Sequence, residues 1–288
     1  MRLKVTRVNQ QMKLPHRSGP LGPSPKRRSG HPKSSPKQNQ VLKVKGGSAP
    51  AAPAAQGAEV LILARGAEAL ASAAAALPTP LGQKHRWISV DNAQPEELSA
   101  AVAAELHAWG DAHILVNNTG GPKAGPLLEA SPEAFLSAFT NHLIVNQRLA
   151  QLVVPGMLRA GYGRIVNVVS TSVKAPLHGL GVSNTVRAAV GNWSKTLATE
   201  LAPVGITVNN VLPGATSTER LRAIIDGRAA HTKRSAQEIE DEMKAEVPMG
   251  RFADPSEIAA AVVFLASPEA SYISGINIPV DGGRTPNL

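Results

Sequence analysis

The nine residues His113–Gly121, HILVNNTGG, combine two features that decide the fold. Isoleucine, leucine and valine follow one another without a polar interruption, and two asparagines, a threonine and two glycines come next. A continuous apolar run, rather than strict alternation, is typical of a strand that is covered on both faces of a parallel sheet. The polar residues then fall at the end of that strand, where open parallel sheets bind their ligands.

Five further short apolar runs have the same character: Val60–Ala64, Ile88–Val90, Arg164–Val169, Ile206–Leu212 and Ile276–Val280. Helical stretches separate them, and two of these begin with a capping oxygen followed by proline in the first turn, at Ser131-Pro132 and Asp254-Pro255. The alternation of strands and helices predicts a single α/β domain with a doubly wound, Rossmann-like parallel sheet.

The charge of the chain is unevenly distributed. The 288 residues carry a net charge of +9, but residues 1–56 hold twelve Lys and Arg and no acid, and the rest has a net charge of −3. We therefore expect two parts: residues 1–56 as a basic, Pro-rich segment that is disordered or translated in the wrong frame, and residues 57–288 as the domain. The coding DNA upstream of Gly57 tests the second reading.

Several classes of protein are disfavoured by composition. The chain has no cysteine, so disulfides and cysteine-ligated metals are excluded, and we expect no metal site. No apolar run approaches the roughly 18 residues of a membrane span. A basic tail can bind nucleic acid or resemble a transit peptide, but its prolines oppose the amphipathic helix that a transit peptide needs. We expect a cytoplasmic protein without a membrane or nucleic-acid partner.

Three polar clusters follow three of the predicted strands: Asn117–Gly121, Ser170–Ser172 and Pro213–Thr218. The carboxyl ends of parallel strands meet at one edge of a sheet, so these clusters are expected to lie together. Turn formation alone is the competing explanation, since Asn, Ser, Gly and Pro are also turn residues. Three such clusters at three strand ends favour a shared binding site.

These clusters resemble motifs of the short-chain dehydrogenase/reductase family, which includes β-ketoacyl-carrier-protein reductases. The resemblance runs from about Gly57 to Gly283. ILVNNTGG resembles the family's Asn-Asn-Ala-Gly turn, GRIVNVVS its serine-bearing strand, and VNNVLPGATST its Pro-Gly-x-x-x-Thr turn. Pro248–Gly283 is similar to its C-terminal signature. The resemblance implies hydride transfer between NAD or NADP and a carbonyl or alcohol substrate.

The family uses an Asn-Ser-Tyr-Lys tetrad, and only one member is kept here. Ser170 stands at the serine position, Ser183 at the tyrosine position, Arg187 at the lysine position, and His142 at the asparagine position beside Asn141. An aliphatic hydroxyl is a much weaker acid than a phenol, so Ser183 is a poor proton donor. Arg187 remains cationic and can stabilise an alkoxide or bind ribose, and His142 can donate a proton near neutral pH.

The resemblance also implies a set of cofactor-binding residues: Arg65, Asp91, Asn118, Thr119, Gly120, Arg187, Pro213, Gly214 and Thr218. Arg65 stands where NADP-preferring members carry a base for the 2′-phosphate, so NADP is slightly favoured over NAD. The charged helical stretch 219–247 matches the substrate lid in position and names no substrate. The resemblance further implies a homodimer or homotetramer.

The family's first strand and its glycine-rich phosphate turn have no clear counterpart. The nearest sequence is Val41–Gly47, which reaches Gly57 after only ten residues and is followed by Pro50 and Pro53. The first βα unit is therefore predicted to be missing or replaced. Three functions stay open: an oxidoreductase with altered acid/base residues, an inactive nucleotide- or ligand-binding protein of the same fold, and a fusion whose basic tail binds nucleic acid.

Overall fold

The computed structural model describes residues 39–43 and 50–286, and side chains from Pro50 onward. Its strands are β1 (Asn39–Lys43), β2 (Glu59–Ala64), β3 (Arg86–Ser89), β4 (Ile114–Asn118), β5 (Gly163–Val168), β6 (Ile206–Pro213) and β7 (Asn277–Val280). Its helices are α1 (Ala51–Ala55), α2 (Ala67–Ala75), α3 (Pro95–Trp109), α4 (Pro132–Phe139), α5 (Val145–Ala160), α6 (Gly181–Leu201), α7 (Glu219–Thr232), α8 (Ala236–Ala245) and α9 (Pro255–Ala266). The strands form one sheet in the order β3-β2-β1-β4-β5-β6-β7, and every pair is parallel. The predicted Rossmann-like fold is confirmed.

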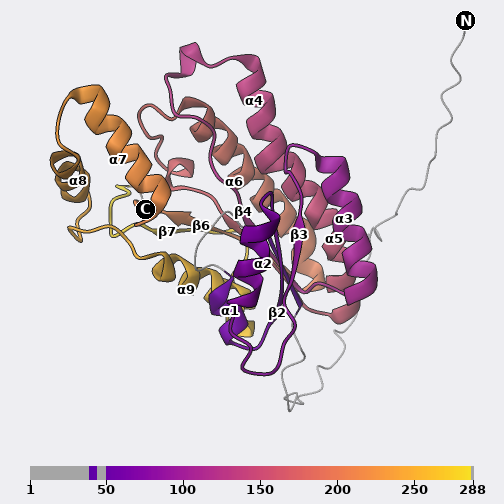
Figure 1. Ribbon diagram of the computed structural model, residues 1–288. Coiled ribbons are helices and arrows are strands. Elements are labelled where there is room, and N and C mark those ends of the chain that lie inside the picture. The colour runs from indigo at the N-terminus through magenta and orange to yellow at the C-terminus, as the bar shows by residue number, and fades with distance from the viewer. Residues whose placement is uncertain (1–38, 44–49, 287–288) are drawn as a thin grey trace, which may run out of the picture. The chain divides into compact units, whose positions relative to one another are not determined.

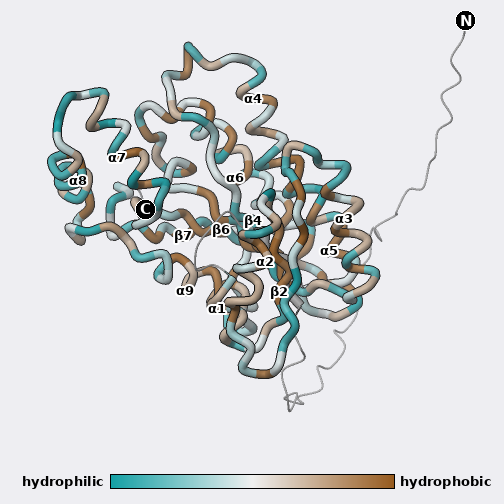
Figure 2. Tube along the Cα trace, in the orientation of Figure 1, coloured by the Kyte–Doolittle hydropathy of each residue, from teal (hydrophilic) through white to brown (hydrophobic). Residues whose placement is uncertain are grey.

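Each face of the sheet packs against its own layer of helices (Figure 1). One core joins alternate residues of the strands to α2 and α9, and the other joins the intervening residues to α3, α5 and α6. The hydropathy view shows the consequence, with brown strands in the centre of the domain and teal at α8 on its margin (Figure 2). Burial on both faces explains why the strands read as continuous apolar runs.

The first βα unit was predicted to be missing or replaced, and the prediction that it is missing is wrong. Strand β1 pairs in parallel with β2, from Asn39 opposite Glu59 to Lys43 opposite Leu63, and with β4 on its other side. Its sequence NQVLK has only two central apolar residues and lies in a basic segment, so it carries little local strand signal. The crossover helix α1 has only five residues, which fits within the short span before β2. Residues 44–49, including the two glycines of the candidate phosphate turn, lie outside the described residues.

Both predicted helix starts are confirmed. The Ser131 side chain accepts a hydrogen bond from the Ala134 N–H at the start of α4. Asp254 and Glu257 form a reciprocal capping box at the start of α9. Such caps satisfy backbone donors that would otherwise lack partners, and each typically contributes about 1 kcal/mol. Between α4 and α5 the chain passes through a π-helical turn, Thr140–Ile144, which contains His142.

Four asparagines occupy one level of four neighbouring strands: Asn117 on β4, Asn167 on β5, Asn210 on β6 and Asn277 on β7. Their amides form a chain of hydrogen bonds of 2.9, 3.0 and 2.8 Å in that order. Ser194 of α6 accepts from Asn167 and donates to Asn210, both at 2.8 Å. We call these five side chains the asparagine ladder. Because burying an amide without a partner is unfavourable, the ladder fixes the register of these strands.

Candidate active site

The three predicted polar clusters lie at the carboxyl edge of the sheet, after β4, β5 and β6. Each cluster begins at or just beyond the asparagine ladder, so the ladder holds the strand ends from which the turns depart. Helix α6, which supplies Ser194 to the ladder, also carries Ser183 and Arg187. The fold thereby directs one helix and three turns to a single edge.

Arg187 connects two of these turns. Its guanidinium donates to the carbonyl oxygen of Val169 after β5 and, at 3.5 Å, to that of Thr119 after β4. Its Nε also donates to the Ser183 hydroxyl at 3.3 Å, one helical turn away. Burial, and then the nearby charge of Arg220, lower the pKa of Arg187 to about 10. Arg187 is therefore still protonated at neutral pH.

Arg220 reaches the turn after β4 from helix α7. It lies in the first turn of α7, within the predicted lid, and donates to the carbonyl oxygen of Gly121 at 3.2 Å. A Cβ atom added to Gly121 would lie 2.9 Å from Nη2 of Arg220 and 3.3 Å from Nη2 of Arg187. Gly121 thus leaves room for both guanidinium groups, which converge on the turn after β4.

The other predicted tetrad positions differ in how they connect to this cluster. Ser183 is buried and contacts Arg187 directly. Ser170 follows Val169, and its hydroxyl accepts a hydrogen bond from the Ser172 N–H at 3.1 Å, so it caps a short turn at the end of β5. His142 is 6% exposed, and its π-helical turn packs against α6. The structure brings Ser183 and Arg187 together, with Ser170 beside the carbonyl that Arg187 binds.

The turn after β6 is shaped by close packing. A Cβ atom on Gly214 would lie 2.7 Å from Cα of Asp281, so only glycine fits there. Thr218 caps α7 by accepting from the Leu221 N–H at 3.3 Å. The N-terminus of α7 consequently faces the same edge as the other turns, with its partial positive charge.

Arg65 and Asp91 lie further along the edge, after β2 and β3. Arg65 is exposed, and its carbonyl oxygen accepts a hydrogen bond from Ser89 at 2.9 Å. The Asp91 carboxylate accepts from the Ala93 N–H at 3.0 Å and holds its own turn. Strand β1 separates this pair of strands from β4, so the two groups of predicted cofactor residues flank its end.

Sequence reasoning missed Arg220. The signal available was its position: a base in the first turn of a helix opposes the helix dipole, and such a residue is disfavoured there without another role. Nothing in the sequence indicated that α7 returns to a turn 99 residues earlier in the chain.

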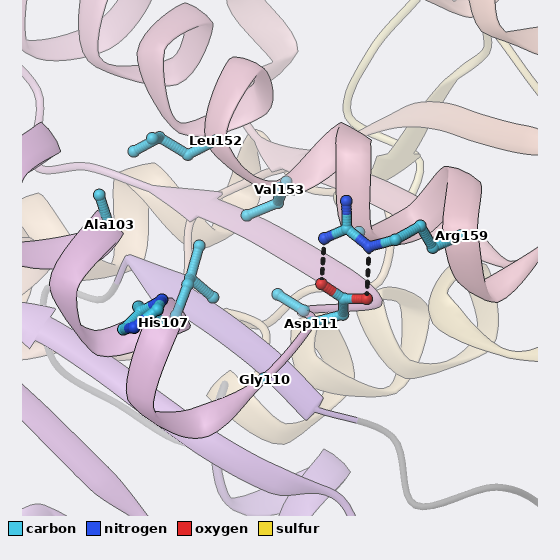
Figure 3. Close-up of a pocket in the computed structure, with 10 residues that line it drawn as sticks. Ala103, His107, Gly110, Asp111, Leu152, Val153 and Arg159 are labelled. Atoms are coloured by element: carbon cyan, nitrogen blue, oxygen red, sulfur yellow. Dashed lines mark hydrogen bonds and ion pairs between the residues drawn. The ribbon is translucent and has the colours of Figure 1, made fainter.

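A separate cavity of about 390 Å³ lies between α3 and α5, near the start of β4 (Figure 3). At this cavity the Arg159 guanidinium and the Asp111 carboxylate form a bidentate ion pair, which lowers the pKa of Asp111. None of the predicted site residues lines this cavity, and it lies near the amino end of the strand rather than the carboxyl end.

Over residues 39–43 and 50–286, no group of three potential metal-ligating side chains is present. No described helix is long and apolar enough to cross a membrane.

Comparison with known sequences identifies the family. A profile described as "Enoyl-(Acyl carrier protein) reductase" matches residues 47–285. The 3-oxoacyl-[acyl-carrier-protein] reductase FabG of Vibrio cholerae is 35% identical over 205 residues, which are 70% of this chain and 79% of that protein. A putative ketoacyl reductase of Streptomyces coelicolor is 34% identical and covers 79% of this chain and 88% of its own length. The chain belongs to the short-chain dehydrogenase/reductase family.

Solved structures agree with this assignment. L-sorbose reductase from Gluconobacter frateurii, in complex with NADPH and L-sorbose, superposes with a TM-score of 0.81 at 31% identity, over 88% of this chain and 98% of that one. An actinorhodin polyketide ketoreductase with NADPH gives 0.80 at 29% identity, over 87% and 98%. An NAD⁺-bound xylitol dehydrogenase gives 0.78 at 25% identity, over 85% and 98%.

Proposed function

We propose that the protein is an NAD(P)-dependent oxidoreductase that transfers hydride between the nicotinamide and a small carbonyl or alcohol substrate. The observation that carries the proposal is the convergence of Ser183, Arg187 and the turns after β4 and β5 at the carboxyl edge of the sheet. NADPH is named with two of the similar reductases and NAD⁺ with the xylitol dehydrogenase, which supports a nicotinamide cofactor here.

The described part of this edge fits such a cofactor. The capped N-terminus of α7 offers backbone donors to an anionic group, and Gly214 lets the turn after β6 pack directly against Asp281. Asn118, Thr119, Gly120, Pro213 and Thr218 would line the nicotinamide end, and Asp91 and Arg65 the adenosine end. When bound, the nicotinamide ring supplies or accepts the hydride.

The chain's own groups would handle the oxygen of the substrate. Ser170 would hold that oxygen by a hydrogen bond, and the fixed positive charge of Arg187 would stabilise the alkoxide as it forms. Ser183, hydrogen-bonded to Arg187, would pass a proton between that oxygen and solvent. His142 is a second candidate proton donor, because its turn packs against α6. The cost of the missing phenol is a slower proton transfer, typically by about 10²–10⁴-fold.

One observation favours a second candidate, a ligand-binding protein without turnover. Arg187 donates its hydrogen bonds to protein oxygens, and its partner Ser183 is a much weaker acid than a phenol. The discriminating experiment measures NADPH binding by fluorescence and NADPH oxidation with an acetoacetyl thioester and with L-sorbose as probe carbonyls. Binding with oxidation supports the enzyme, binding alone supports the second candidate, and absence of binding contradicts both.

A paired substitution sharpens this test. Ser183→Tyr with Arg187→Lys restores the family's tyrosine and lysine, and we expect it to raise the turnover of the probe carbonyls about tenfold or more. Arg187→Lys alone is the matched control and is expected to give no such gain. An unchanged rate in the double variant, with NADPH affinity retained, would show that proton donation by Ser183 does not limit the reaction.

The preference for NADP rests on Arg65, which is exposed beyond β2. Arg65→Gln should weaken NADPH binding about tenfold and leave NADH binding unchanged, since the lost contact is to the 2′-phosphate. Lys84→Gln, an exposed change of the same charge, is the control. Equal losses for NADPH and NADH would remove the basis for NADP preference.

A homodimer or homotetramer is proposed from the surface around β7. This strand has one neighbour in the described sheet, and Phe264, Tyr272 and Ile276 expose large apolar side chains beside it. Light scattering on the full chain measures the assembly, and Tyr272→Asp should shift it toward the monomer.

We also propose a cytoplasmic location.

A further inference from the structure

The strongest unassigned feature is the meeting of two arginines at one glycine. Nη2 of Arg220 and Nη2 of Arg187 lie 2.9 and 3.3 Å from the same point, the Cβ position that Gly121 leaves empty. They come from helices α7 and α6, on two sides of the turn after β4. The mutual repulsion is large enough for the charge of Arg220 to contribute to the lowered pKa of Arg187.

No described acid pairs with either arginine. Among residues 50–286, whose side chains the structure describes, eight ion pairs are formed, and neither Arg187 nor Arg220 takes part in any of them. Their acceptors are backbone carbonyl oxygens and one serine hydroxyl, which carry no net charge. Other arginines of the domain do pair with acids. Arg251, for example, donates a hydrogen bond to each carboxylate oxygen of Glu257.

The backbone adds positive potential to the same place. Thr218 caps α7, so Arg220 stands in the first turn of that helix, where the dipole already carries partial positive charge. A fold gains nothing from placing two guanidiniums and a helix N-terminus together, because each raises the electrostatic energy of the others. An anion that binds between them removes this repulsion.

We propose that Arg187, Arg220 and the N-terminus of α7 form an anion site that takes a phosphate or carboxylate group of the bound ligand. The arginine N–H groups that the carbonyl oxygens leave unused match the two oxygens of such a group, which a guanidinium binds in a fork. The proposal rests on the proposed function, since the ligand is the nicotinamide cofactor or its substrate. Two sources share this chemistry: the pyrophosphate of the dinucleotide, and an acid group carried by the substrate.

Direct binding of two small probes tests the site. Inorganic pyrophosphate and oxalate are titrated separately into the full chain by calorimetry, at low and at high ionic strength. Both Arg220→Gln and the wild type are measured, with Arg222→Gln as the matched control, because Arg222 lies on the same helix and pairs with Glu240. We expect Arg220→Gln to weaken probe binding about tenfold or more, and Arg222→Gln to leave it within a factor of about two.

Arg220→Lys separates charge from shape. It keeps the cation and loses the planar fork, so probe affinity should fall between those of the wild type and Arg220→Gln. Circular dichroism of each variant confirms that α7 is kept. Equal affinity of the wild type, Arg220→Gln and Arg222→Gln for both probes, or no binding of either probe to the wild type, would overturn the proposal.

Competition identifies the source of the anion. If pyrophosphate displaces NADPH and Arg220→Gln weakens NADPH binding, the site serves the cofactor. If Arg220→Gln leaves NADPH binding intact and loses oxalate binding, the site serves an acidic substrate. A chain that binds the probes through Arg220 but binds no NADPH keeps the anion site and contradicts the proposed oxidoreductase, so the two failures are distinct.

Discussion

The asparagine ladder and the two arginines at Gly121 are both polar clusters in the same half of the sheet, but they differ in whether their polar groups bind one another. The ladder is neutral and is buried except at Asn277, and its amides join in an unbroken chain from β4 to β7, in which Oδ1 of Asn117 alone accepts no hydrogen bond from a described residue. The arginines are charged and converge without a counter-ion among the described residues. Polar groups that satisfy one another serve the fold, whereas like charges gathered without a partner point to a ligand.

Breaking the ladder at its centre should have the largest effect on stability. Asn167→Ala leaves Asn117 without its acceptor and removes two further hydrogen bonds, to Ser194 and Asn210. We expect the free energy of unfolding to fall by about 3 kcal/mol, measured by urea denaturation. Asn277→Ala, at the half-buried end of the ladder, is the control and should cost about 1 kcal/mol. A smaller loss at position 167 than at position 277 would contradict a cooperative ladder.

Removing Arg187, which is partly buried, should affect activity and hardly affect stability. Arg187→Met deletes the cation beside Ser183 and the Val169 carbonyl, and we expect kcat/KM for the better probe carbonyl to fall about 100-fold. The free energy of unfolding should change by less than about 1 kcal/mol, because removing a partly buried charge that has no counter-ion offsets the loss of the hydrogen bonds to Ser183, Val169 and Thr119. A large loss of stability with unchanged kcat/KM would show that Arg187, like the asparagine ladder, stabilises the fold and does not act on the substrate.

A single methyl group can perturb the arginines alone. Gly121→Ala places Cβ 2.9 Å from Nη2 of Arg220, so this guanidinium must shift. The affinity for pyrophosphate or oxalate should fall roughly tenfold or less, with the unfolding midpoint unchanged. Gly125→Ala is the control, since its added Cβ meets no atom within 4 Å. Equal behaviour of the two variants would show that the guanidinium positions do not matter.

The smallest effect is expected for Arg251, which forms an ion pair with Glu257, in contrast to Arg187 and Arg220. Arg251, followed by the Asp254 N–H, lowers the pKa of Glu257 from 4.5 to about 2. Because the folded pKa is depressed, the stabilisation is present above about pH 4.5 and is lost as the pH falls toward about 2. Glu257→Gln should therefore lower the melting temperature modestly at neutral pH, and the difference from the wild type should shrink through that window. A difference that is constant with pH would exclude the ion pair as its cause.

Much of the fold was predictable because its signals are local. Continuous apolar runs located six strands, and capping residues such as Ser131 and Asp254 located helix starts. Strand β1 was missed because NQVLK owes its place to hydrogen bonds with neighbours on both sides, which no local pattern records. The ladder depends on the relative register of four strands, and that register is likewise invisible in one sequence.

The site was predictable only in outline. The edge of the sheet and the residues after the strands followed from the parallel topology, and the resemblance supplied positions such as Ser183 and Arg187. Arg220 was not found, because its role depends on where the first turn of α7 lies in space relative to Gly121. Contacts between segments far apart in the chain are set by packing rather than by local sequence.

The hydrogen bond from Arg220 to the Gly121 carbonyl must open before that N–H group of Arg220 can bind a ligand. Helix α7 is anchored by the buried side chains of Leu221 and Ile225, which pack with Ile239 of α8, so the helix itself need not move. A single exposed hydrogen bond is worth about 1 kcal/mol, so roughly one molecule in six has it open at any moment. Opening requires only rotation of a surface side chain, which takes picoseconds to nanoseconds. Capture of an anion by Arg220 should thus be limited by diffusion rather than by a conformational change of the domain.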